Sequence, residues 1–513
     1  MSVVKVDDLR VAFGAAQVVR GVSFEIGAGE CLALVGESGS GKSVTARTLV
    51  GLTGEGARVS AGELTFAGQD LTGLRERAWR RLRGGRIGFV LQDALVSLDP
   101  LRKVGKEIEE VLAAHTGLSG PSRRARVIEL LASAGVPEPE LRAAQLPHEL
   151  SGGLRQRALI ATALAADPEL VVADEPTTAL DVTIQAQVLD LLASIKGQGR
   201  SLLVISHDLA VVARLADRVA VMKDGVIVEH GPTRRVLAEP EHDYTKQLLR
   251  AIPAEHTKGT RLSGAAPAGP RRAPGEVVVR AEGIGKSFGG RAAVQDVSFT
   301  LRAAETLGIV GESGSGKTTT ARIALGLTAP DTGTVAVNGR KRDVQVVYQD
   351  TLASFDPRYT VAKVLAEALS VADVPRERRR ARSVELLELV GLGEEHLARR
   401  PLRLSGGQRQ RVAIARALAP GPSVIVCDEP VSALDVSVQA QVLDLLEDVQ
   451  RETGVAYLFI SHDLGVVHHL CDRVLVMKDG RVVEEGPVGT VFQEPAHPYT
   501  RELVAAVPRL AAV

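Results

Sequence analysis

Short runs of consecutive apolar residues alternate along the chain with segments whose apolar residues recur at helical spacing. Residues 31–35, 170–173 and 202–205 are uninterrupted apolar runs, which is the pattern of parallel strands buried on both faces of a sheet. Between the second and third runs, the residues at helical spacing are Val188, Leu191, Leu192 and Ile195. Buried strands that alternate with amphipathic helices predict an α/β fold.

The same order of features occurs a second time. The helical spacing returns at Val442, Leu445, Leu446 and Val449. A hairpin with an Asp-Gly turn is predicted over residues 218–229, and it returns over residues 473–484. Self-similarity over this length predicts two copies of one domain. The first copy is longer, which indicates a longer edge segment around residues 62–83.

A change of composition separates the two copies. Between Pro253 and Gly275 the chain is rich in Pro, Gly, Ala and Arg and has no apolar period, which is typical of a flexible linker. We therefore predict a first domain at residues 1–252, a linker at 253–275 and a second domain at 276–513.

Composition and charge narrow the class of protein. The chain has 513 residues, of which 45% are hydrophobic, and it has 62 basic and 62 acidic residues. This balance gives no global positive charge that would attract nucleic acid. No apolar run approaches the length of about 20 residues that spans a bilayer, and the first ten residues lack the hydrophobic region of a signal peptide. We therefore expect the chain to stay in the cytosol. Buried, reduced thiols are expected at Cys31, Cys427 and Cys471.

Each copy contains a glycine-rich motif between an apolar strand and a helix. GESGSGKS occupies residues 36–43 and GESGSGKT occupies residues 311–318. Such P-loops surround phosphate oxygens with backbone N–H groups at a helix N-terminus. The lysine of each motif is expected to contact the β- and γ-phosphates of ATP, and the hydroxyl of its last residue to bind Mg²⁺. The predicted ATP-binding residues are Gly36, Glu37, Ser38, Gly39, Ser40, Gly41, Lys42, Ser43, Gly311, Glu312, Ser313, Gly314, Ser315, Gly316, Lys317 and Thr318, and Ser43 and Thr318 are also predicted magnesium ligands.

Two successive acids end a buried strand in each copy, in LVVADEP (170–176) and VIVCDEP (424–430). In each pair the aspartate is expected to hold the magnesium shell, and the glutamate to orient and deprotonate the attacking water. Helix capping by an acid is the alternative, but the neighbouring P-loop favours catalysis. The predicted magnesium ligands are Asp174 and Asp428, and the predicted bases are Glu175 and Glu429.

A third motif, LSGGLRQR at 150–157 and LSGGQRQR at 404–411, resembles the signature of ATP-binding-cassette (ABC) ATPases. A Ser-Gly-Gly sequence that opens a helix is a second anion-binding N-terminus. The resemblance covers nearly the whole chain except the linker. It implies two tandem P-loop NTPase domains of the ABC type, each with a mixed or parallel sheet core, an antiparallel β edge and an α-helical subdomain. The signature residues implied to bind ATP are Ser151, Gly152, Gly153, Ser405, Gly406 and Gly407.

The resemblance also implies roles for further residues of each copy. A glutamine contacts Mg²⁺ and the attacking water, a histidine senses the γ-phosphate, an aspartate forms the D-loop, and an aromatic ring stacks on adenine. These residues are Gln92 and Gln349, His207 and His462, Asp181 and Asp435, and Phe13 and Phe288. Each of the two phenylalanines precedes its P-loop by the same distance in sequence.

In this family one cassette supplies the P-loop of a site and the other supplies the signature. The fused chain is therefore expected to pair its two cassettes and to build both composite sites by itself. Leu154 stands where the second copy has Gln408. Because the serine and the backbone N–H groups of the signature remain, both sites are expected to hydrolyse ATP.

Two further pairs of motifs resemble those of peptide and nickel importers. QDALVSLDP and QDTLASFDP begin at Gln92 and Gln349, and EPEHDYTKQLL and EPAHPYTRELV begin at Glu239 and Glu494. The resemblance implies an importer ATPase for a small substrate, above all a dipeptide or oligopeptide, and glutathione, peptide antibiotics, nickel and certain sugars are the other cargoes of such importers. Its partners would be two transmembrane permeases and an extracytoplasmic substrate-binding protein. The chain would then be peripheral at the cytoplasmic face of the membrane.

Two alternatives remain. One is a fused sugar-importer ATPase, although the two intact acid pairs argue against its usual degraded site. The other is a soluble twin-cassette ATPase that acts on ribosomes or nucleic acid, but the chain lacks a long charged linker helix and CxxC pairs. The basic run at 376–382 is interpreted as the solvated face of a helix. Exposed helix positions are expected for His242, His468 and His469, and packing alone for His497.

Overall fold

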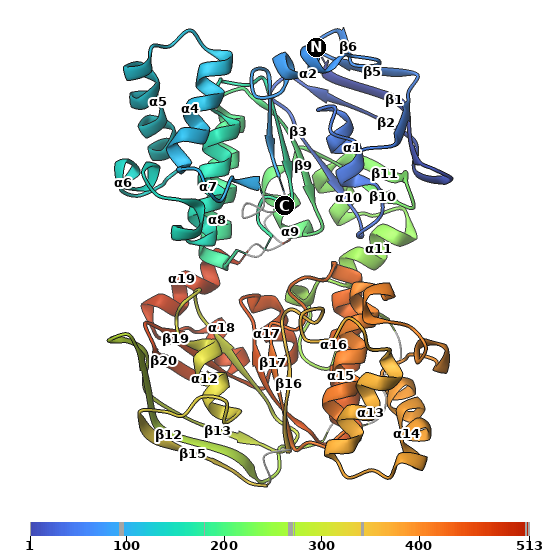
Figure 1. Cartoon of the computed structure of the whole chain (residues 1–513), viewed down its shortest axis with the longest axis vertical. Coiled ribbons are helices and arrows are strands. Elements are labelled where there is room, and N and C mark those ends of the chain that lie inside the picture. Colours follow the sequence, from blue (N-terminus) through green and yellow to red (C-terminus); the bar gives the residue numbers. More distant parts are fainter. Residues whose placement is uncertain are drawn as a thin grey trace. The chain divides into compact units, whose positions relative to one another are not determined.

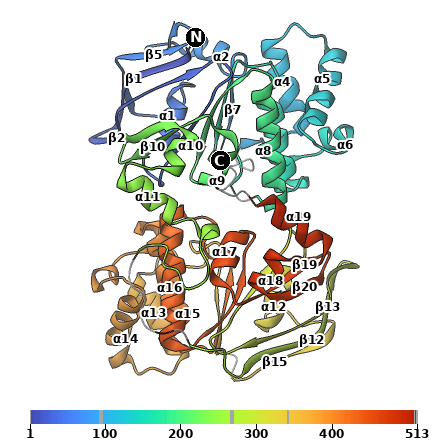
Figure 2. The same ribbon diagram turned by 180° about the vertical axis from the view of Figure 1, so that it is seen from behind.

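The computed structural model describes residues 2–91, 97–178, 180–264, 270, 272–339, 343–507 and 510. They form two compact units. The first unit consists mainly of the chain up to Leu180 together with Ile184–Leu249, and the second consists mainly of Arg250–Val507. Each unit combines β-sheets with a separate group of helices (Figures 1 and 2), so the predicted α/β class is confirmed.

The central sheet of the first unit has the order β11-β10-β3-β9-β8-β7, and only β11 runs antiparallel to its neighbour. Its middle strands β3, β8 and β9 are buried along their whole length, as their solid apolar runs predict. The strands are β3 (Cys31–Val35), β7 (Ile87–Val90), β8 (Leu170–Asp174), β9 (Ser201–Ser206), β10 (Arg218–Lys223) and β11 (Val226–Pro232).

The second unit repeats this sheet in the order β16-β17-β18-β14-β19-β20, again with one antiparallel edge strand. The strands are β14 (Thr306–Val310), β16 (Val344–Val347), β17 (Val424–Asp428), β18 (Ala456–Ile460), β19 (Arg473–Lys478) and β20 (Arg481–Pro487). The two predicted Asp-Gly hairpins are therefore confirmed as β10-β11 and β19-β20.

Each unit also has an antiparallel sheet, which has five strands in the first unit and three in the second among the described residues. The additional strands and helix α2 (Glu76–Leu82) confirm a longer edge segment in the first copy. The strands are β1 (Ser2–Phe13), β2 (Ala16–Gly27), β4 (Ala57–Ser60), β5 (Glu63–Phe66) and β6 (Gln69–Asp70), and then β12 (Val277–Phe288), β13 (Arg291–Arg302) and β15 (Thr332–Val337).

The helices follow the strands in the same order in both units. Those of the first unit are α1 (Lys42–Thr48), α4 (Val104–His115), α5 (Gly120–Ser133), α6 (Pro139–Ala143), η1 (Pro147–Glu149), α7 (Gly152–Ala163), α8 (Val182–Gly197), α9 (Leu209–Leu215), α10 (Thr233–Ala238) and α11 (Asp243–Arg250). Those of the second unit are η2 (Pro253–Glu255), α12 (Lys317–Ala324), α13 (Val361–Val371), α14 (Arg376–Leu389), η4 (Glu394–His396), η5 (Pro401–Arg403), α15 (Gly406–Leu418), α16 (Val436–Thr453), α17 (Leu464–Leu470), α18 (Val488–Gln493) and α19 (Pro498–Ala506).

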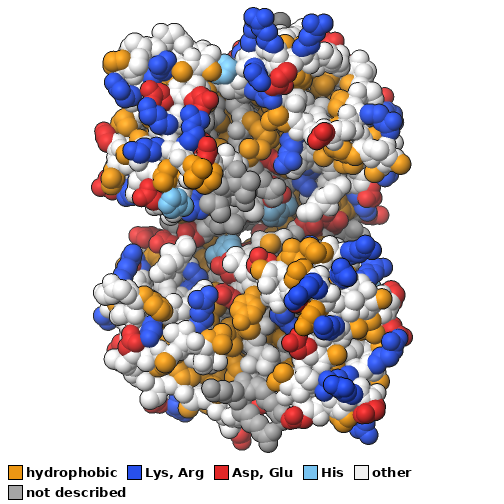
Figure 3. All heavy atoms as spheres, in the orientation of Figure 1, with side chains coloured by type: hydrophobic (Ala, Val, Ile, Leu, Met, Phe, Trp, Pro, Cys, Tyr) orange, Lys and Arg blue, Asp and Glu red, His pale blue; other side chains and the backbone are white. Residues whose placement is uncertain are grey.

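The cysteines and the charged side chains lie where the sequence predicts them. Cys31, Cys427 and Cys471 are buried free thiols, as expected, and burial raises the pKa of Cys31 and of Cys471 to about 12. The arginines of the basic run lie at exposed or half-exposed positions of α14. On the face shown in Figure 3, basic, acidic and apolar side chains are interspersed. None of the described helices has the length and apolarity that a membrane span requires.

Residues 258–263, expected to be part of a flexible linker, are instead bonded to the second unit. Asp444 of α16 accepts hydrogen bonds from the backbone N–H of Leu262 at 3.1 Å and of Ser263 at 2.9 Å. Lys258 Nζ donates to Asp472 Oδ2 at 2.7 Å, and Arg261 lies 2.8 Å from Asp448. The segment has no helix or strand, but charges of the second unit satisfy its backbone and its basic side chains.

The burial of one histidine differs from the exposed helix position that was expected for it. Helix η2 packs on α17, and His469 of α17 is fully buried rather than exposed. Burial lowers the pKa of His469 to about 4, so the ring is neutral at physiological pH.

Asp444→Ala should release residues 258–263 from α16, because it leaves the buried N–H of Leu262 and the partly buried N–H of Ser263 without their acceptor, at a cost of about 1–3 kcal/mol. Limited trypsin digestion should then cleave the variant after Lys258 and Arg261 faster than the parent chain. Asp190→Ala is the matched control, since Asp190 has the equivalent place in the first copy but is 68% exposed in its pair with Arg214. Equal cleavage rates in the parent chain and Asp444→Ala would show that Asp444 does not hold the segment.

Candidate functional site

The candidate site of each unit lies at the carboxyl ends of three adjacent parallel strands. In the first unit β9 lies between β3 and β8, and in the second β18 lies between β14 and β17. The P-loop follows β3 in the first unit and β14 in the second. The acid pair lies at the end of β8 and of β17, and the histidine follows β9 and β18. Parallel strands place all their carboxyl ends at one edge of the sheet, which brings these residues together.

Each P-loop lies against the carboxyl end of the next strand of its sheet. Gly36 has φ 147°, and a Cβ atom on it would lie 2.2 Å from the carbonyl oxygen of Met222. Gly311 has φ 149° and the same 2.2 Å approach to Met477. These two positions therefore require glycine. The motif glycines allow the turn that leads into α1 and α12.

The P-loop lysines are buried and turned back onto their own loops. Lys42 Nζ donates to the carbonyl oxygens of Gly36 at 2.7 Å and Glu37 at 2.8 Å. Lys317 Nζ makes the corresponding bonds to Gly311 and Glu312, both at 2.8 Å. Burial lowers the pKa of Lys317. A buried ammonium group at this place is suited to a phosphate anion.

The aspartates face the hydroxyl groups of the P-loops. Ser43 Oγ donates to Asp174 Oδ1 at 2.9 Å, and Thr318 Oγ1 lies 3.5 Å from Asp428 Oδ1. Asp174 is fully buried, and its Oδ2 has no hydrogen-bond partner among the described residues. Burial raises the pKa of both aspartates. A hydroxyl group beside a buried, unsatisfied carboxylate oxygen fits the ligand preference of Mg²⁺.

The glutamates are held in a sparsely populated backbone conformation and contact the predicted histidines. Glu175 and Glu429 have φ 48° and 49°, which is the left-handed region that a non-glycine residue occupies at an energetic cost. His207 Nδ1 lies 3.4 Å from Glu175 Oε1, and His462 Nδ1 lies 3.2 Å from Glu429 Oε1. The two pairs are thus equivalent in geometry.

The same contacts shift the pKa values of these pairs. Burial by itself would raise the pKa of Glu175 and Glu429, but the hydrogen bond and charge of the histidine lower it below the ordinary value. Burial alone would lower the pKa of His207 and His462, but the glutamate raises it. Both glutamates are therefore ionised at neutral pH and able to accept a proton from water.

Two neighbouring side chains orient these glutamates. Thr178 Oγ1 donates to Glu175 Oε2 at 2.9 Å, and Gln349 Nε2 donates to Glu429 Oε2 at 2.8 Å. Gln349 thus lies beside the predicted base, and its contact with water and Mg²⁺ stays a prediction. Gln92 falls outside the described residues, so its expected role stays a prediction. Thr178 was not anticipated, although its position three residues after Glu175 is a signal for it.

The signature serines cap the helices of the two helical subdomains. Ser151 Oγ accepts a hydrogen bond from Leu154 N at 3.4 Å at the start of α7. Ser405 Oγ accepts one from Gln408 N at 3.3 Å, and Gln408 Oε1 accepts one from Ser405 N at 3.1 Å. Leu154 cannot return this second bond. Among the hydrogen bonds of the described residues, none joins either serine to the P-loop of its own unit.

The second glycine of each signature allows close packing between two helices. A Cβ atom on Gly153 would lie 2.5 Å from Ile184 Cγ2 of α8, and one on Gly407 would lie 2.4 Å from Val438 Cγ1 of α16. Asp435, predicted in the D-loop, caps α16 by accepting from Val438 N at 3.1 Å.

The two predicted adenine-stacking rings lie at the ends of β1 and β12. Phe13 is half-buried near Gly54, and Phe288 is 54% exposed with Lys286 Nζ 5.8 Å from its ring centroid. Phe288 thus leaves much of its surface open to a base, and Phe13 leaves less. The adenine contact of both residues stays a prediction.

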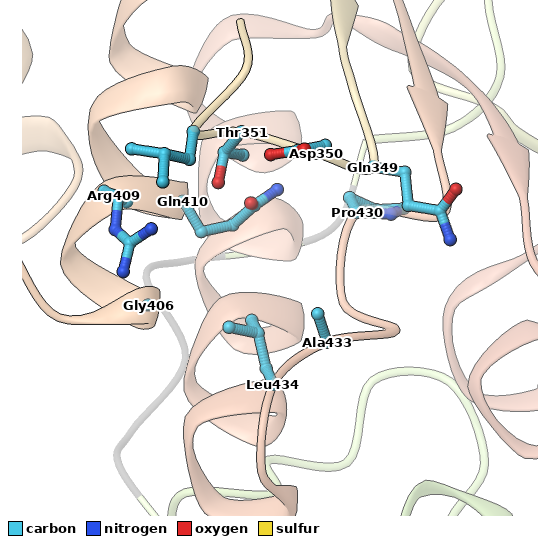
Figure 4. A pocket seen from close by; sticks show the side chains of 10 residues that line it. Gln349, Asp350, Thr351, Gly406, Arg409, Gln410, Pro430, Ala433 and Leu434 are labelled. Carbon is cyan, nitrogen blue, oxygen red and sulfur yellow. The ribbon is translucent and has the colours of Figure 1, made fainter. Parts of the chain in front are cut away.

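A cavity of about 290 Å³ adjoins Gln349 in the second unit (Figure 4). Gln410 of α15 lies between the Asp350–Thr351 segment and Leu434, and it is 3% exposed with no partner for its Nε2. The lining residues are Gln349, Asp350, Thr351, Leu352, Gly406, Arg409, Gln410, Pro430, Ala433 and Leu434. The site glutamine and the signature helix therefore line one common cavity.

The sequence also failed to reveal that the tail contacts the P-loop. The hydroxyl oxygens of Tyr244 and Tyr499 accept hydrogen bonds from the backbone N–H of Glu37 and Glu312. His497, for which packing alone was expected, caps α19 by accepting from Tyr499 N at 3.2 Å. The available signal was the shared order of His and Tyr in the two tail motifs.

Comparison with known proteins places these sites within a family. The profile of the ABC transporter family matches residues 19–178 and 294–432. The profile of the oligopeptide/dipeptide transporter C-terminal region matches residues 228–291 and 483–513. The first profile covers the P-loop, the signature and the acid pair of both units, and the second covers both tails.

Full-length relatives carry related names. The peptidoglycan transport ATP-binding protein YejF of Agrobacterium fabrum is 44% identical over 99% of this chain and 97% of its own length. The oligopeptide transport ATP-binding protein OppD of Mycobacterium bovis is 40% identical over 98% of each chain. The glutathione import ATP-binding protein GsiA of Salmonella typhimurium is 42% identical over 99% of this chain and 89% of its own. Each of these alignments spans both units.

Among solved structures, the RNase-L inhibitor covers 94% of this chain and 90% of its own, with a TM-score of 0.66 and 22% sequence identity. This likeness concerns the fold.

Proposed function

The chain belongs to the ABC transporter family, and we propose that it is the ATP-hydrolysing subunit of a bacterial importer that takes up peptides. One observation carries this proposal: each unit places its P-loop lysine, its paired acids and its histidine together with equivalent geometry. Neither copy of the site has lost a residue that phosphate cleavage needs.

The chemistry of the site follows from these contacts. ATP would draw the lysine of each P-loop away from the two carbonyl oxygens of its loop and onto the phosphates. Mg²⁺, when bound, would offset phosphate charge, and the hydroxyl–aspartate pairs Ser43–Asp174 and Thr318–Asp428 would hold it. The glutamate would then take a proton from the attacking water, while its histidine keeps the carboxylate in place.

We further propose that each site is completed by the signature of the other unit. Ser405 and Gly407 would meet ATP bound at Lys42, and Ser151 and Gly153 would meet ATP bound at Lys317. The support is that both signature serines begin helices of at least twelve residues, whose N-termini favour anions. The γ-phosphate would then stabilise a closed pair of units, and its release would allow the pair to open.

The proposed cargo class rests on the relatives and the tails. Relatives at 40–44% identity are named for transport of peptidoglycan and oligopeptides or import of glutathione, and both tails match the oligopeptide/dipeptide transporter profile. The chain would act at the cytoplasmic face of the membrane. Its partners would be two transmembrane permeases that receive cargo from an extracytoplasmic substrate-binding protein.

Replacing both bases, as in Glu175→Gln/Glu429→Gln, should lower the ATPase rate of the purified chain by about 100-fold or more, because no carboxylate then accepts the proton of water. Each single substitution should also lower the rate, since each removes the base of one site. Glu169→Gln is the matched control: this exposed residue pairs with Arg86 at the opposite end of β8, and the rate should not change. A single variant with the parental rate would show that its site does not hydrolyse ATP.

ATP should make the Glu175→Gln/Glu429→Gln chain more compact than ADP does, because only ATP offers a γ-phosphate to both units. Small-angle X-ray scattering measures this as a smaller radius of gyration. The same chain with Lys42→Ala and Lys317→Ala added should show no difference between the nucleotides. Identical scattering of the parent variant in ATP and ADP would contradict the pairing of the units.

In the native host, the Glu175→Gln/Glu429→Gln chain should abolish growth on a dipeptide that supplies a required amino acid. Growth on the free amino acid should be unaffected, because uptake of the amino acid does not depend on this chain. Normal growth on every peptide offered would contradict peptide import. If uptake of a sugar failed at the same time, the cargo would be a sugar.

A further inference from the structure

The tail of each unit ends in a helix whose first turn reaches the P-loop. The Tyr244 hydroxyl oxygen of α11 accepts a hydrogen bond from the backbone N–H of Glu37 at 3.0 Å. In the second unit, Tyr499 of α19 accepts the equivalent bond from Glu312 at 2.9 Å. Both tyrosines are only 3% exposed. The contact is therefore built twice, from two tails whose sequences differ.

Each tyrosine is itself held firmly. Tyr244 N donates to His242 Nδ1 at 3.1 Å, which caps the start of the helix. Glu229 of β11 accepts from the backbone N–H of Glu241 at 2.8 Å and of His242 at 3.1 Å. Lys223 Nζ lies 4.8 Å from the centroid of the Tyr244 ring. A continuous series of contacts thus runs from the edge hairpin through the tail to the P-loop.

The second tail repeats these supports one by one. Tyr499 N donates to His497 Nδ1 at 3.2 Å, and Glu484 of β20 accepts from the N–H of Ala496 at 2.9 Å and of His497 at 3.0 Å. Lys478 Nζ lies 4.6 Å from the centroid of the Tyr499 ring. The support of the tyrosine is therefore a property of the motif.

The bonded N–H belongs to a peptide unit with a special position. The carbonyl of Gly36 and the N–H of Glu37 are the two ends of one peptide group, and Lys42 Nζ holds the carbonyl while the Tyr244 oxygen holds the N–H. When Lys42 moves to a phosphate, the first of these bonds is lost. The tyrosine bond then keeps the peptide plane, and with it the direction of the following N–H groups of the loop.

We propose that Tyr244 and Tyr499 are positioning residues for nucleotide binding, through which the tail of each unit keeps its P-loop in the phosphate-binding shape. This inference rests on the nucleotide-binding part of the proposed function. It does not depend on peptide import or on the pairing of the units.

The test is the affinity of the full chain for Mg²⁺-ADP and Mg²⁺-ATP, measured by calorimetric titration. Tyr244→Phe/Tyr499→Phe keeps both rings over their lysines and removes only the hydroxyl oxygens. The loss of one neutral hydrogen bond per loop should weaken binding by about three- to tenfold, and KM for ATP should rise more than kcat falls. Parental affinity for both nucleotides in a folded variant would overturn the proposal.

Tyr359→Phe is the matched control, because Tyr359 also lies against a lysine, with Lys363 Nζ 3.8 Å from its ring, but precedes α13 in the helical subdomain. Its affinity should equal that of the parent chain. If the parent chain itself bound no ADP, the proposed nucleotide binding would be wrong. This result differs from parental affinity in the tyrosine variant, which would contradict the positioning role alone.

Amide hydrogen exchange provides a second readout that needs no nucleotide. In Tyr244→Phe, exchange should accelerate in peptides that cover Gly36–Lys42 and stay parental in those that cover Gly311–Lys317, and Tyr499→Phe should give the reverse. Exchange that accelerates in neither P-loop, or equally in both, would contradict a local positioning role.

Discussion

The arrangement of the whole molecule depends on gathering backbone N–H groups around one phosphate. A P-loop can do this only if its first glycine adopts a conformation closed to other residues and lies against a neighbouring strand, as Gly36 does at Met222. A rigid parallel sheet supplies that strand, and its adjacent strands bring the acids and the histidine to the same edge. The central sheet of each unit therefore holds its P-loop in place.

Each site contains charged side chains that are buried from water. Asp174 is fully buried, and its Oδ2 lies 4.0 Å from Arg47 Nε without a hydrogen bond. Lys317 is a buried cation that donates to two backbone carbonyl oxygens, and burial lowers its pKa. Such groups are costly unless they are paired. The Glu175–His207 and Glu429–His462 pairs solve the same problem internally, since each partner stabilises the charge of the other. Each glutamate thus stays ionised beside its histidine.

The sequence predicted whatever depends on neighbours along the chain. A P-loop, an acid pair or a capped signature helix is specified by a few consecutive residues, and these parts were found where expected. Contacts between distant residues were missed. Tyr244 and Glu37 lie 207 positions apart, and residues 258–263 are held by Asp444 of α16, whose counterpart Asp190 in the first copy is exposed. No local pattern distinguishes these two aspartates, because burial is decided by what packs over them.

The signature helices differ in how they begin. Ser405 and Gln408 bond each other reciprocally, whereas Leu154 leaves Ser151 with a single bond. Two identical subunits encoded by one gene would have to share either arrangement. Once both copies lie on one polypeptide, each can drift or specialise without its twin, and their one-to-one stoichiometry is set at translation. Fusion of the two copies therefore allows their sequences, and with them the properties of the two sites, to diverge independently.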